Sequence, residues 1–476
     1  MVNWGGMDRR TFLASTATAL TSAASADSAP GDRPNFLFLI ADDLTYDGIR
    51  ALGNSEVETP NLDRLVRQGC AFTHCFHQGS WLGAVCVASR SMLNSGVSAF
   101  RVQKDFENVP LWGETFGKAG YQTAIVGKWH LSKTALERSF QEHSKVFMGG
   151  MYESGPEAYN RPASGNTWTP WDKSLKGQWM HTAAFQDGSD TVKHSAQIWA
   201  ECATERLTAM AAKQDPFLLY VGFTSPHDPR QAPKEYVDRY PATKVAVPQN
   251  YQSEHPFDQG DAKVRDELLA PFPRTRAAVQ VHRSEYYAHV TYLDHQIGLI
   301  LDALEKSGKA SNTYIVFTAD HGLAVGQHGL MGKQNMYDHS TRIPLIVVGP
   351  AVTKGRRVKE LVYQHSVFAT TCHLAGLAIP KSVEFPSLVS WMMGAGGQGE
   401  ESVFCYYRDF QRSVRTKTHK LIVYPKAGRT QLFDLTQDPW ETHDLSAEPG
   451  LADVKAELVQ LLKAHQRDLS DTLALA

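Results

Sequence analysis

The sequence predicts an α/β fold: a large, mixed and mostly parallel sheet sandwiched by helices, followed by a smaller antiparallel sheet with one helix. The first observation is a series of apolar runs with little alternation, typical of strands buried on both faces; they lie at 35–40, 121–126, 216–223, 313–318 and 343–348. The second is that polar, titratable residues follow the first four runs. The third is a change of pattern after about residue 386.

Length and composition agree with an ordinary globular protein of two parts. The chain has 476 residues, enough for one large core and a smaller domain at about 150 residues per domain. We expect a catalytic domain at 33–385 and a small α+β subdomain at 386–476. The net charge of −2 lacks the basic footprint that a nucleic-acid partner requires, so no nucleic acid is expected.

The N-terminus resembles a twin-arginine export signal. Arg9 and Arg10 precede Phe12, a mild Ala/Ser/Thr/Leu run follows, and an A-x-A end closes at Ala26. This pattern predicts a signal peptide at 1–26 and a periplasmic or secreted protein. No later segment approaches the ~18 uncharged apolar residues of a membrane span, so none is expected.

The first apolar run leads directly into two carboxylates, Asp42 and Asp43. Adjacent carboxylates at the end of a buried strand repel each other strongly unless a cation lies between them. The sequence therefore places a candidate cation site at the end of this strand.

Helices are expected between the strands. The segment 59–63 opens one that buries Leu62, Leu65 and Val66, and 286–304 is amphipathic, with apolar residues in alternating steps of four and three. Two long aromatic, Gly/Pro-rich insertions at 132–190 and 231–276 are expected as loops. The first holds five aromatic residues that either form a wall over the site or simply pack the loop: Tyr152, Tyr159, Trp168, Trp171 and Trp179.

Titratable residues gather after the four apolar runs. In an open α/β sheet, ligands bind at the carboxyl ends of the strands, so these residues should share one edge. They are Asp42, Asp43, Lys128, His130, His227, Asp320, His321 and, from a following loop, Lys333. Taken singly, each His or Lys is more often structural.

The segment 86–96, C-V-A-S-R-S-M-L-N-S-G, is the stretch around which the site is organised. Cys86 is expected where a loop enters a helix, with Arg90 on the same face one turn later. A helix N-terminus beside a fixed positive charge favours anions. The alternative is a buried structural cysteine, one of six that are too sparse for a disulfide framework or a Cys-x-x-Cys zinc site.

After about residue 386 the pattern changes to short strands and turns. They are predicted at 403–407, 412–416, 420–423 and 431–435. A helix at 451–469 follows, which predicts a small antiparallel sheet covered by one helix.

C-V-A-S-R resembles the C-x-A-S-R variant of the motif C-x-P-S-R, which marks the catalytic residue of the sulfatase family. G-K-W-H, P-H-D-P, T-A-D-H-G, G-K-Q and L-F-D-L-x-x-D-P-W-E-T also follow in the family's order. The resemblance covers nearly all of the chain after residue 33. It implies an alkaline phosphatase-like fold, sulfuric ester hydrolysis, and oxidation of Cys86 to formylglycine by a formylglycine-generating enzyme.

The resemblance also implies a divalent metal, held by Asp42, Asp43, Asp320, His321 and residue 86. Independently, carboxylates without a cysteine pair are hard ligands that suit calcium or magnesium better than zinc. Calcium is the expected ion, and magnesium is less favoured.

A catalytic mechanism follows from the same resemblance. Hydrated formylglycine at position 86 attacks sulfur beside Arg90, while Lys333 helps to hold the sulfate oxygens. His227 matches the acid that protonates the leaving alkoxide, with Lys128 nearby. His130 matches the base that takes a proton from the second hydroxyl and regenerates the aldehyde.

The expected partner is a sulfated saccharide or a sulfated small molecule, with aryl sulfates and choline sulfate as open possibilities. One alternative function is a phosphate or phosphonate monoester hydrolase of the same superfamily. Another is a non-catalytic binder of sulfated glycans that leaves Cys86 unmodified. The mass of the peptide containing residue 86 separates the binder from the enzyme.

Overall fold

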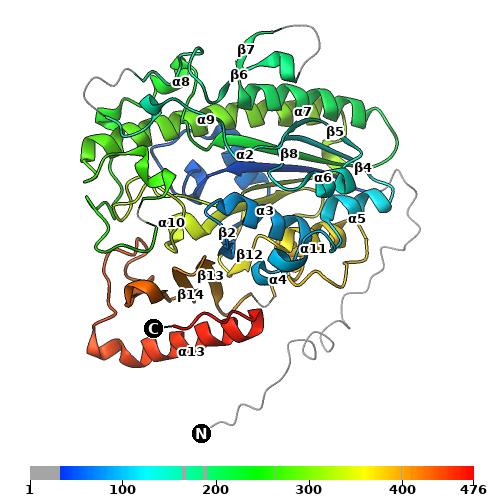
Figure 1. Cartoon of the computed structure of the whole chain (residues 1–476). Coiled ribbons are helices and arrows are strands. Elements are labelled where there is room, and N and C mark those ends of the chain that lie inside the picture. Colours follow the sequence, from blue (N-terminus) through cyan, green and yellow to red (C-terminus); the bar gives the residue numbers. More distant parts are fainter. Residues whose placement is uncertain (1–32, 163–167, 186–189, 262, 398, 476) are drawn as a thin grey trace.

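The computed structural model describes residues 33–162, 168–185, 190–261, 263–397 and 399–475. The predicted export signal at 1–26 lies outside the described residues. Within these ranges, no helix combines the length and the apolar character that a membrane crossing requires. Figure 1 shows a large sheet between layers of helices, with a second sheet and the C-terminal helix beyond one of these layers.

The large sheet has the strand order β11-β2-β10-β9-β1-β8-β4-β5, and β12 also pairs with β2. Its strands are β1 (Asn35–Asp42), β2 (Cys70–Phe76), β4 (Gln122–Lys128), β5 (Glu142–Phe147), β8 (Phe217–Pro226), β9 (Thr313–Ala319), β10 (Arg342–Val348), β11 (Arg356–Val358) and β12 (Val362–Tyr363). β1 is parallel to both neighbours, and Phe38 is aligned with Tyr220 and Val316. β10 is antiparallel to β9 and β2, so the sheet is mixed and mostly parallel, as predicted.

Helices cover both faces of this sheet. The helices are α2 (Pro60–Gln68), α3 (Val85–Ser95), α4 (Ala99–Asp105), α5 (Trp112–Lys118), α6 (Lys133–Ser139), α7 (Ser195–Ala211), α8 (Lys234–Val237), α9 (Arg276–Lys306), α10 (Asp338–Thr341), α11 (Ser366–Leu374), α12 (Val389–Met392) and α13 (Ala452–Leu469). α7 and α9 pack together on one face, and α3, α5 and α11 lie on the other, between the two sheets. Because helices cover both faces of the sheet, its central strands carry apolar residues on both sides.

Two features of the large sheet differ from the sequence prediction. β2 belongs to the sheet, but no strand was predicted there. The apolar run of β2 is interrupted by Thr73 and His74, which are only partly buried. β5 and α6 lie in the insertion 132–190, which was expected to be a loop.

The long helix begins earlier than its apolar pattern indicated. α9 starts at Arg276, where the Thr275 side chain accepts a hydrogen bond from the Ala278 backbone N–H. Its first turns bury polar groups such as His282 and Glu285 instead of an apolar stripe. Apolar periodicity therefore located only the later part of the helix, from 286 on.

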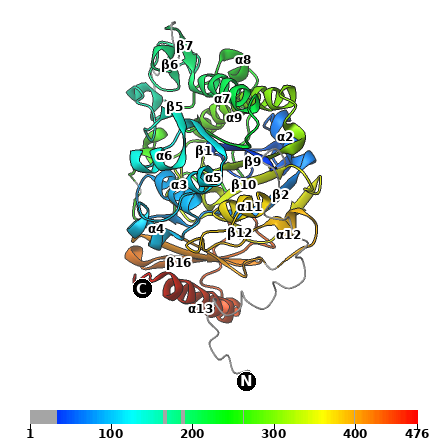
Figure 2. The same cartoon turned by 90° about the vertical axis from the view of Figure 1, so that its right-hand side faces the viewer.

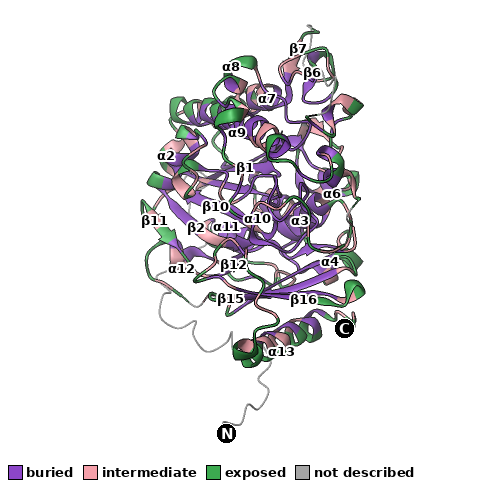
Figure 3. Ribbon diagram, turned by 90° about the vertical axis from the view of Figure 1, so that its left-hand side faces the viewer, coloured by how far each residue is buried: buried purple, intermediate pink, exposed green. Residues whose placement is uncertain are grey.

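The second sheet has the strand order β16-β15-β14-β13-β3. Its strands are β3 (Gly79–Ser80), β13 (Val403–Tyr407), β14 (Gln411–Arg415), β15 (His419–Tyr424) and β16 (Arg429–Asp434). α13 covers this sheet and buries Leu458, Leu462 and Leu469, with its outer face exposed (Figures 2 and 3). The predicted small sheet and covering helix are confirmed, with one addition: β3, just before α3, joins its edge in parallel with β13.

The aromatic residues of the first insertion are mainly packing residues. Tyr152, Trp168 and Trp179 are buried. Tyr152 lies against Phe147 of β5 with ring centroids 4.6 Å apart. Trp179 belongs to β6 (Trp179–His181), which pairs with β7 (Val192–His194). Of the two possibilities, packing of the insertion is the one that these three side chains support.

Candidate active site

Cys86 lies in the first turn of α3, at the point where a loop enters the helix. Small side chains allow this helix to approach the ends of the central strands. Ser89 Oγ donates a hydrogen bond to the Asp320 carbonyl at the end of β9 (2.5 Å), and Gln364 Oε1 lies 3.1 Å from the same hydroxyl. The helix ends at Gly96, which has a left-handed φ of 64°. These contacts hold Cys86 at the carboxyl edge of the sheet.

The two carboxylates after β1 lie at the same edge. Asp43 adopts a φ of 67°, which is uncommon for a residue other than glycine. Its backbone N–H donates to Asp320 Oδ1 (3.3 Å), and its carbonyl accepts from the Tyr286 hydroxyl (2.9 Å). The same hydroxyl accepts from the Thr45 N–H (3.2 Å). Tyr286 of α9 thus fixes the turn that presents Asp43.

Five charged or polar side chains surround the Cys86 sulfur. His321 Nε2 lies 3.1 Å and Asp42 Oδ1 lies 3.4 Å from Sγ. Lys333 Nζ lies 3.7 Å away and Lys128 Nζ 3.9 Å away. The His130 side chain also contacts the thiol.

Arg90 and Asp320 form a fully buried ion pair beside the thiol. Arg90 Nε donates to Asp320 Oδ2 at 3.0 Å, and Nη1 donates to the Lys128 carbonyl at 2.9 Å. Arg90 Nη2 is buried and has no hydrogen-bond acceptor among the described residues.

His227 follows β8 and lies on the other side of Asp43. Its Nε2 is 3.8 Å from Asp43 Oδ2, and its Nδ1 is 3.3 Å from Asp228 Oδ1. Asp228 is paired in turn with Arg265, from the short 3₁₀ helix Arg265–Leu269. Burial lowers the pKa of His227, while Asp43 opposes this shift.

The electrostatics of the site favour an ionised sulfur. Burial raises the pKa of the Cys86 thiol, but Lys128, Lys333 and His321 outweigh burial and hold it well below its ordinary value. Burial also lowers the pKa of His321, yet Asp320, Cys86 and Asp43 raise it to about 9. Burial together with Asp320 raises the pKa of Asp42 well above its ordinary value. Opposite charges are therefore concentrated in a space closed to water.

The donor atoms of Asp42, Asp43, Cys86 and His321 all lie within 4.8 Å of one another, and all four residues are buried. This spacing lets them ligate one metal ion together. Two of the four donors are carboxylates, which suit a hard divalent cation, and they lie beside one imidazole and one thiol. Asp320 lies beside the group, with Oδ1 3.6 Å from His321 Nε2.

The comparisons with known proteins agree with this geometry. The family model "Sulfatase" matches residues 34–377. The chain belongs to the sulfatase family. It is a sulfuric ester hydrolase, and a second model, "N-sulphoglucosamine sulphohydrolase, C-terminal", matches residues 326–468 of this sulfatase.

Relatives of the sulfatase include enzymes named for saccharide substrates. A sulfatase of Formosa agariphila is 29% identical, covering 86% of this chain and 82% of the relative. An N-acetylglucosamine-6-O-sulfatase of Bacteroides thetaiotaomicron is 25% identical, covering 97% and 91%.

Solved structures share the fold. One, a complex with its substrate D-glucosamine-2-N,6-O-disulfate, has a TM-score of 0.71 at 21% identity, covering 92% of this chain and 99% of the other. The phosphonate monoester hydrolase of Agrobacterium radiobacter has a TM-score of 0.72 at 19% identity, covering 92% and 96%. The alkaline phosphatase-like fold predicted from the sequence is confirmed.

The structure of the sulfatase brings together every site residue predicted from its sequence. These are Asp42, Asp43, Cys86, Arg90, Lys128, His130, His227, Asp320, His321 and Lys333. Sequence reasoning missed Asp228, Arg265 and Tyr286. Asp228 belongs to the quoted P-H-D-P motif, so its neighbour His227 was a usable signal. Nothing local to Arg265 or Tyr286 marked them.

Proposed function

We propose that the sulfatase hydrolyses a sulfate ester of a saccharide, using a formylglycine derived from Cys86 and one calcium ion. One observation carries the proposal: cations, carboxylates and imidazoles from separate segments converge within 4 Å of the Cys86 sulfur or of its immediate neighbours. The saccharide is supported by the names of the relatives, one of which is an N-acetylglucosamine-6-O-sulfatase.

The metal would be held by Asp42, Asp43, His321 and residue 86, with Asp320 completing the set. A divalent cation in this position supplies Lewis acidity toward the sulfate oxygens. Calcium suits the site better than magnesium because it accepts more oxygen ligands in less regular geometry. Lys128 and Lys333, paired with Asp42 and Asp43, balance the charge of these carboxylates.

The chain's own groups divide the remaining work. Residue 86, once oxidised to an aldehyde that adds water to give a geminal diol, supplies the hydroxyl that attacks sulfur. Arg90 and Lys333, whose Nζ lies 3.7 Å from Cys86 Sγ, are the candidate groups for binding sulfate oxygens. His227 is the candidate acid for the leaving oxygen, and its Nδ1 lies 2.8 Å from the Asp228 backbone carbonyl, a contact that fixes the orientation of the ring. His130, in contact with residue 86, is the candidate base that returns the site to its starting state.

Tyr286→Phe is expected to weaken calcium binding about 10- to 100-fold, the usual effect of removing an outer-shell hydrogen bond. The lost hydroxyl no longer holds the Asp43 carbonyl and the Thr45 N–H. Calorimetric titration with calcium measures this directly. Tyr292→Phe on the same helix is the matched control. Equal calcium affinity in Tyr286→Phe and wild type would refute the positioning role.

Lys333→Ala is expected to leave the fold intact and to raise KM about 10- to 100-fold with a smaller change in kcat, because a charged hydrogen bond to the substrate is lost. Asp43 keeps His321 as a partner at 3.2 Å. Steady-state kinetics on an aryl sulfate provide the measurement. The exposed Lys213→Ala is the control, and a wild-type KM in Lys333→Ala would contradict the assignment.

Phosphonate or phosphate monoester hydrolysis is the second candidate, since phosphonate monoester hydrolases share this fold. The described residues offer a ligand group for a second cation only at Asp43, His227 and Asp228, and Arg265 already pairs with Asp228. Sulfate carries less charge than phosphate, so one metal favours the sulfate ester. Parallel rates on 4-nitrophenyl sulfate and 4-nitrophenyl phosphate decide between them, and faster phosphate hydrolysis would reverse the assignment.

The proposal includes export and maturation. The N-terminal pattern at 1–26 supports a periplasmic or secreted location, and Cys86 requires a formylglycine-generating enzyme as a partner. The division at 386 into a catalytic domain and a C-terminal subdomain belongs to the same proposal. N-terminal sequencing of the protein recovered outside the cytoplasm, with residues 1–26 absent, tests the export signal.

A further inference from the structure

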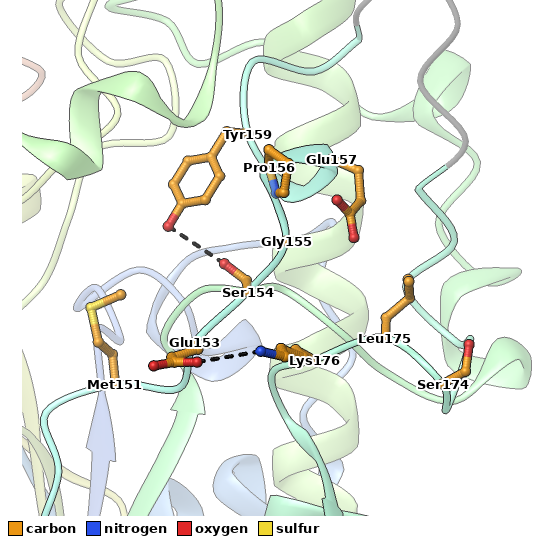
Figure 4. Close-up of a pocket in the computed structure, with 10 residues that line it drawn as sticks. All are labelled: Met151, Glu153, Ser154, Gly155, Pro156, Glu157, Tyr159, Ser174, Leu175 and Lys176. Atoms are coloured by element: carbon orange, nitrogen blue, oxygen red, sulfur yellow. Dashed lines mark hydrogen bonds and ion pairs between the residues drawn. The ribbon is translucent and has the colours of Figure 1, made fainter.

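The first insertion forms an open cavity of about 720 Å³, a volume usual for small-molecule sites. Two stretches line it, 151–159 and 174–176. Figure 4 shows these stretches facing each other, with Glu153 and Lys176 joined across the gap and Ser154 hydrogen-bonded to Tyr159.

The first wall is fixed to the candidate base. Gly150, the residue before this wall, accepts a hydrogen bond from Lys128 Nζ through its carbonyl. A Cβ atom at Gly150 would overlap the His130 imidazole, so the backbone lies directly against that ring. The first wall therefore begins beside Lys128 and His130, two residues of the candidate active site.

The second wall is fixed next to the candidate acid. Gly177 follows Lys176 and has a φ of 135°, and a Cβ there would overlap Pro229. Pro229 comes two residues after His227. The cavity thus lies on the side of the centre where the leaving group is protonated.

The lining of this cavity is polar and carries more negative than positive charge. Glu153 and Glu157 contribute carboxylates, Lys176 contributes the one ammonium group among the lining residues, and Ser154 and Ser174 contribute hydroxyls. Tyr159 is the one aromatic ring in the lining. The Glu153 and Lys176 side chains are 90% and 74% exposed and lie 3.5 Å apart, a weak pair that a ligand can replace.

We propose, building on the function proposed above, that this cavity binds the sugar ring of the substrate through its hydroxyl groups and discriminates against rings that carry a second sulfate. Carboxylates accept hydrogen bonds from sugar hydroxyls, and the same carboxylates repel a further anion. The substrate class is a neutral saccharide bearing one sulfate. A single aromatic ring does not form the cage that a quaternary ammonium group such as choline requires, and it offers little surface to an aryl leaving group.

The experiment uses enzyme matured to formylglycine, with the modification verified by mass. Its substrates are a panel of neutral hexoses and N-acetylhexosamines sulfated at each single position, the corresponding disulfated sugars, choline sulfate and 4-nitrophenyl sulfate. We expect the best monosulfated sugar to exceed its disulfated counterpart in kcat/KM by about five- to tenfold at low ionic strength, with a smaller ratio at high salt, because exposed charges are screened.

The double variant E153Q/E157Q retains side-chain size and removes both charges. We expect its preference for the monosulfated sugar to fall to about twofold or less, while 4-nitrophenyl sulfate hydrolysis and the unfolding temperature stay nearly unchanged, since the Glu153–Lys176 pair that is lost is exposed and contributes little. E137Q, an exposed glutamate on α6 outside the cavity, is the matched control and keeps the wild-type ratio.

Several results would overturn the inference. One is turnover of the disulfated sugar that equals or exceeds that of the monosulfated sugar, and another is a preference for choline sulfate. The others are hydrolysis of 4-nitrophenyl sulfate but of no sulfated sugar, and an unchanged ratio of monosulfated to disulfated turnover in E153Q/E157Q. In each of these cases the enzyme still hydrolyses a sulfate ester. Failure of the proposed function is distinct, because fully matured enzyme would then hydrolyse none of these esters.

Discussion

Cys86→Ala is expected to abolish sulfate ester hydrolysis, lowering kcat by about 10⁴-fold or more, as removal of a covalent nucleophile does. Alanine has neither a thiol nor any group that oxidation could convert to formylglycine. The lysines and histidines around position 86 remain, but none of them replaces the nucleophile that attacks the sulfur of the sulfate ester. Steady-state kinetics on 4-nitrophenyl sulfate provide the measurement.

The matched control is Cys202→Ala. Cys202 is a buried free cysteine in α7, outside the site. Its removal is expected to change stability slightly and to leave turnover at the wild-type rate. Turnover by Cys86→Ala at a comparable rate would contradict the nucleophile assignment.

Asp320→Ala is expected both to abolish turnover and to destabilise the fold by about 3–5 kcal/mol, because breaking a buried ion pair leaves an uncompensated charge. Arg90 and Asp320 have side chains that are 0% exposed. Asp320 Oδ1 also accepts from the Asp43 N–H, so the turn that presents Asp43 loses one of its supports. Urea unfolding and steady-state kinetics measure the two effects.

Asp320→Asn separates the two effects. The amide keeps the side-chain volume and an oxygen that can accept a hydrogen bond from Arg90, but it leaves the Arg90 charge uncompensated, so the stability should return only in part. It removes the negative charge beside the candidate metal, so turnover should stay lost. An active Asp320→Asn enzyme would show that this charge has no part in the reaction.

Much of the fold was predictable because buried parallel strands leave an unmistakable apolar run. The runs at 35–40, 121–126 and 313–318 became β1, β4 and β9. The parallel order of β1, β4, β8 and β9 explains why their final residues meet at one edge. Part of the site was predictable for the same reason, since its carboxylates lie at or just after the ends of β1 and β9, whereas Cys86 and Arg90 lie on α3 and were predicted from their motif.

The missed features depend on contacts between distant segments. Thr73 and His74 interrupt the apolar pattern of β2, so the sequence did not predict this strand. Its place in the sheet is set by pairing with β10. Arg265 reaches Asp228 from a segment without a helical or strand pattern. The sequence pattern indicated only that Tyr286 is one apolar position of an amphipathic helix. Its second role, holding the turn at Asp43, follows from the contacts of its hydroxyl with Asp43 and Thr45.

The mass of the peptide containing residue 86 tests the central claim most directly. The protein is produced with a formylglycine-generating enzyme, digested, and measured without reduction. We predict that Cys86 has lost the elements of H₂S and gained one oxygen, while Cys202 keeps its thiol mass. An unmodified cysteine at position 86 in protein that hydrolyses sulfate esters would contradict the account.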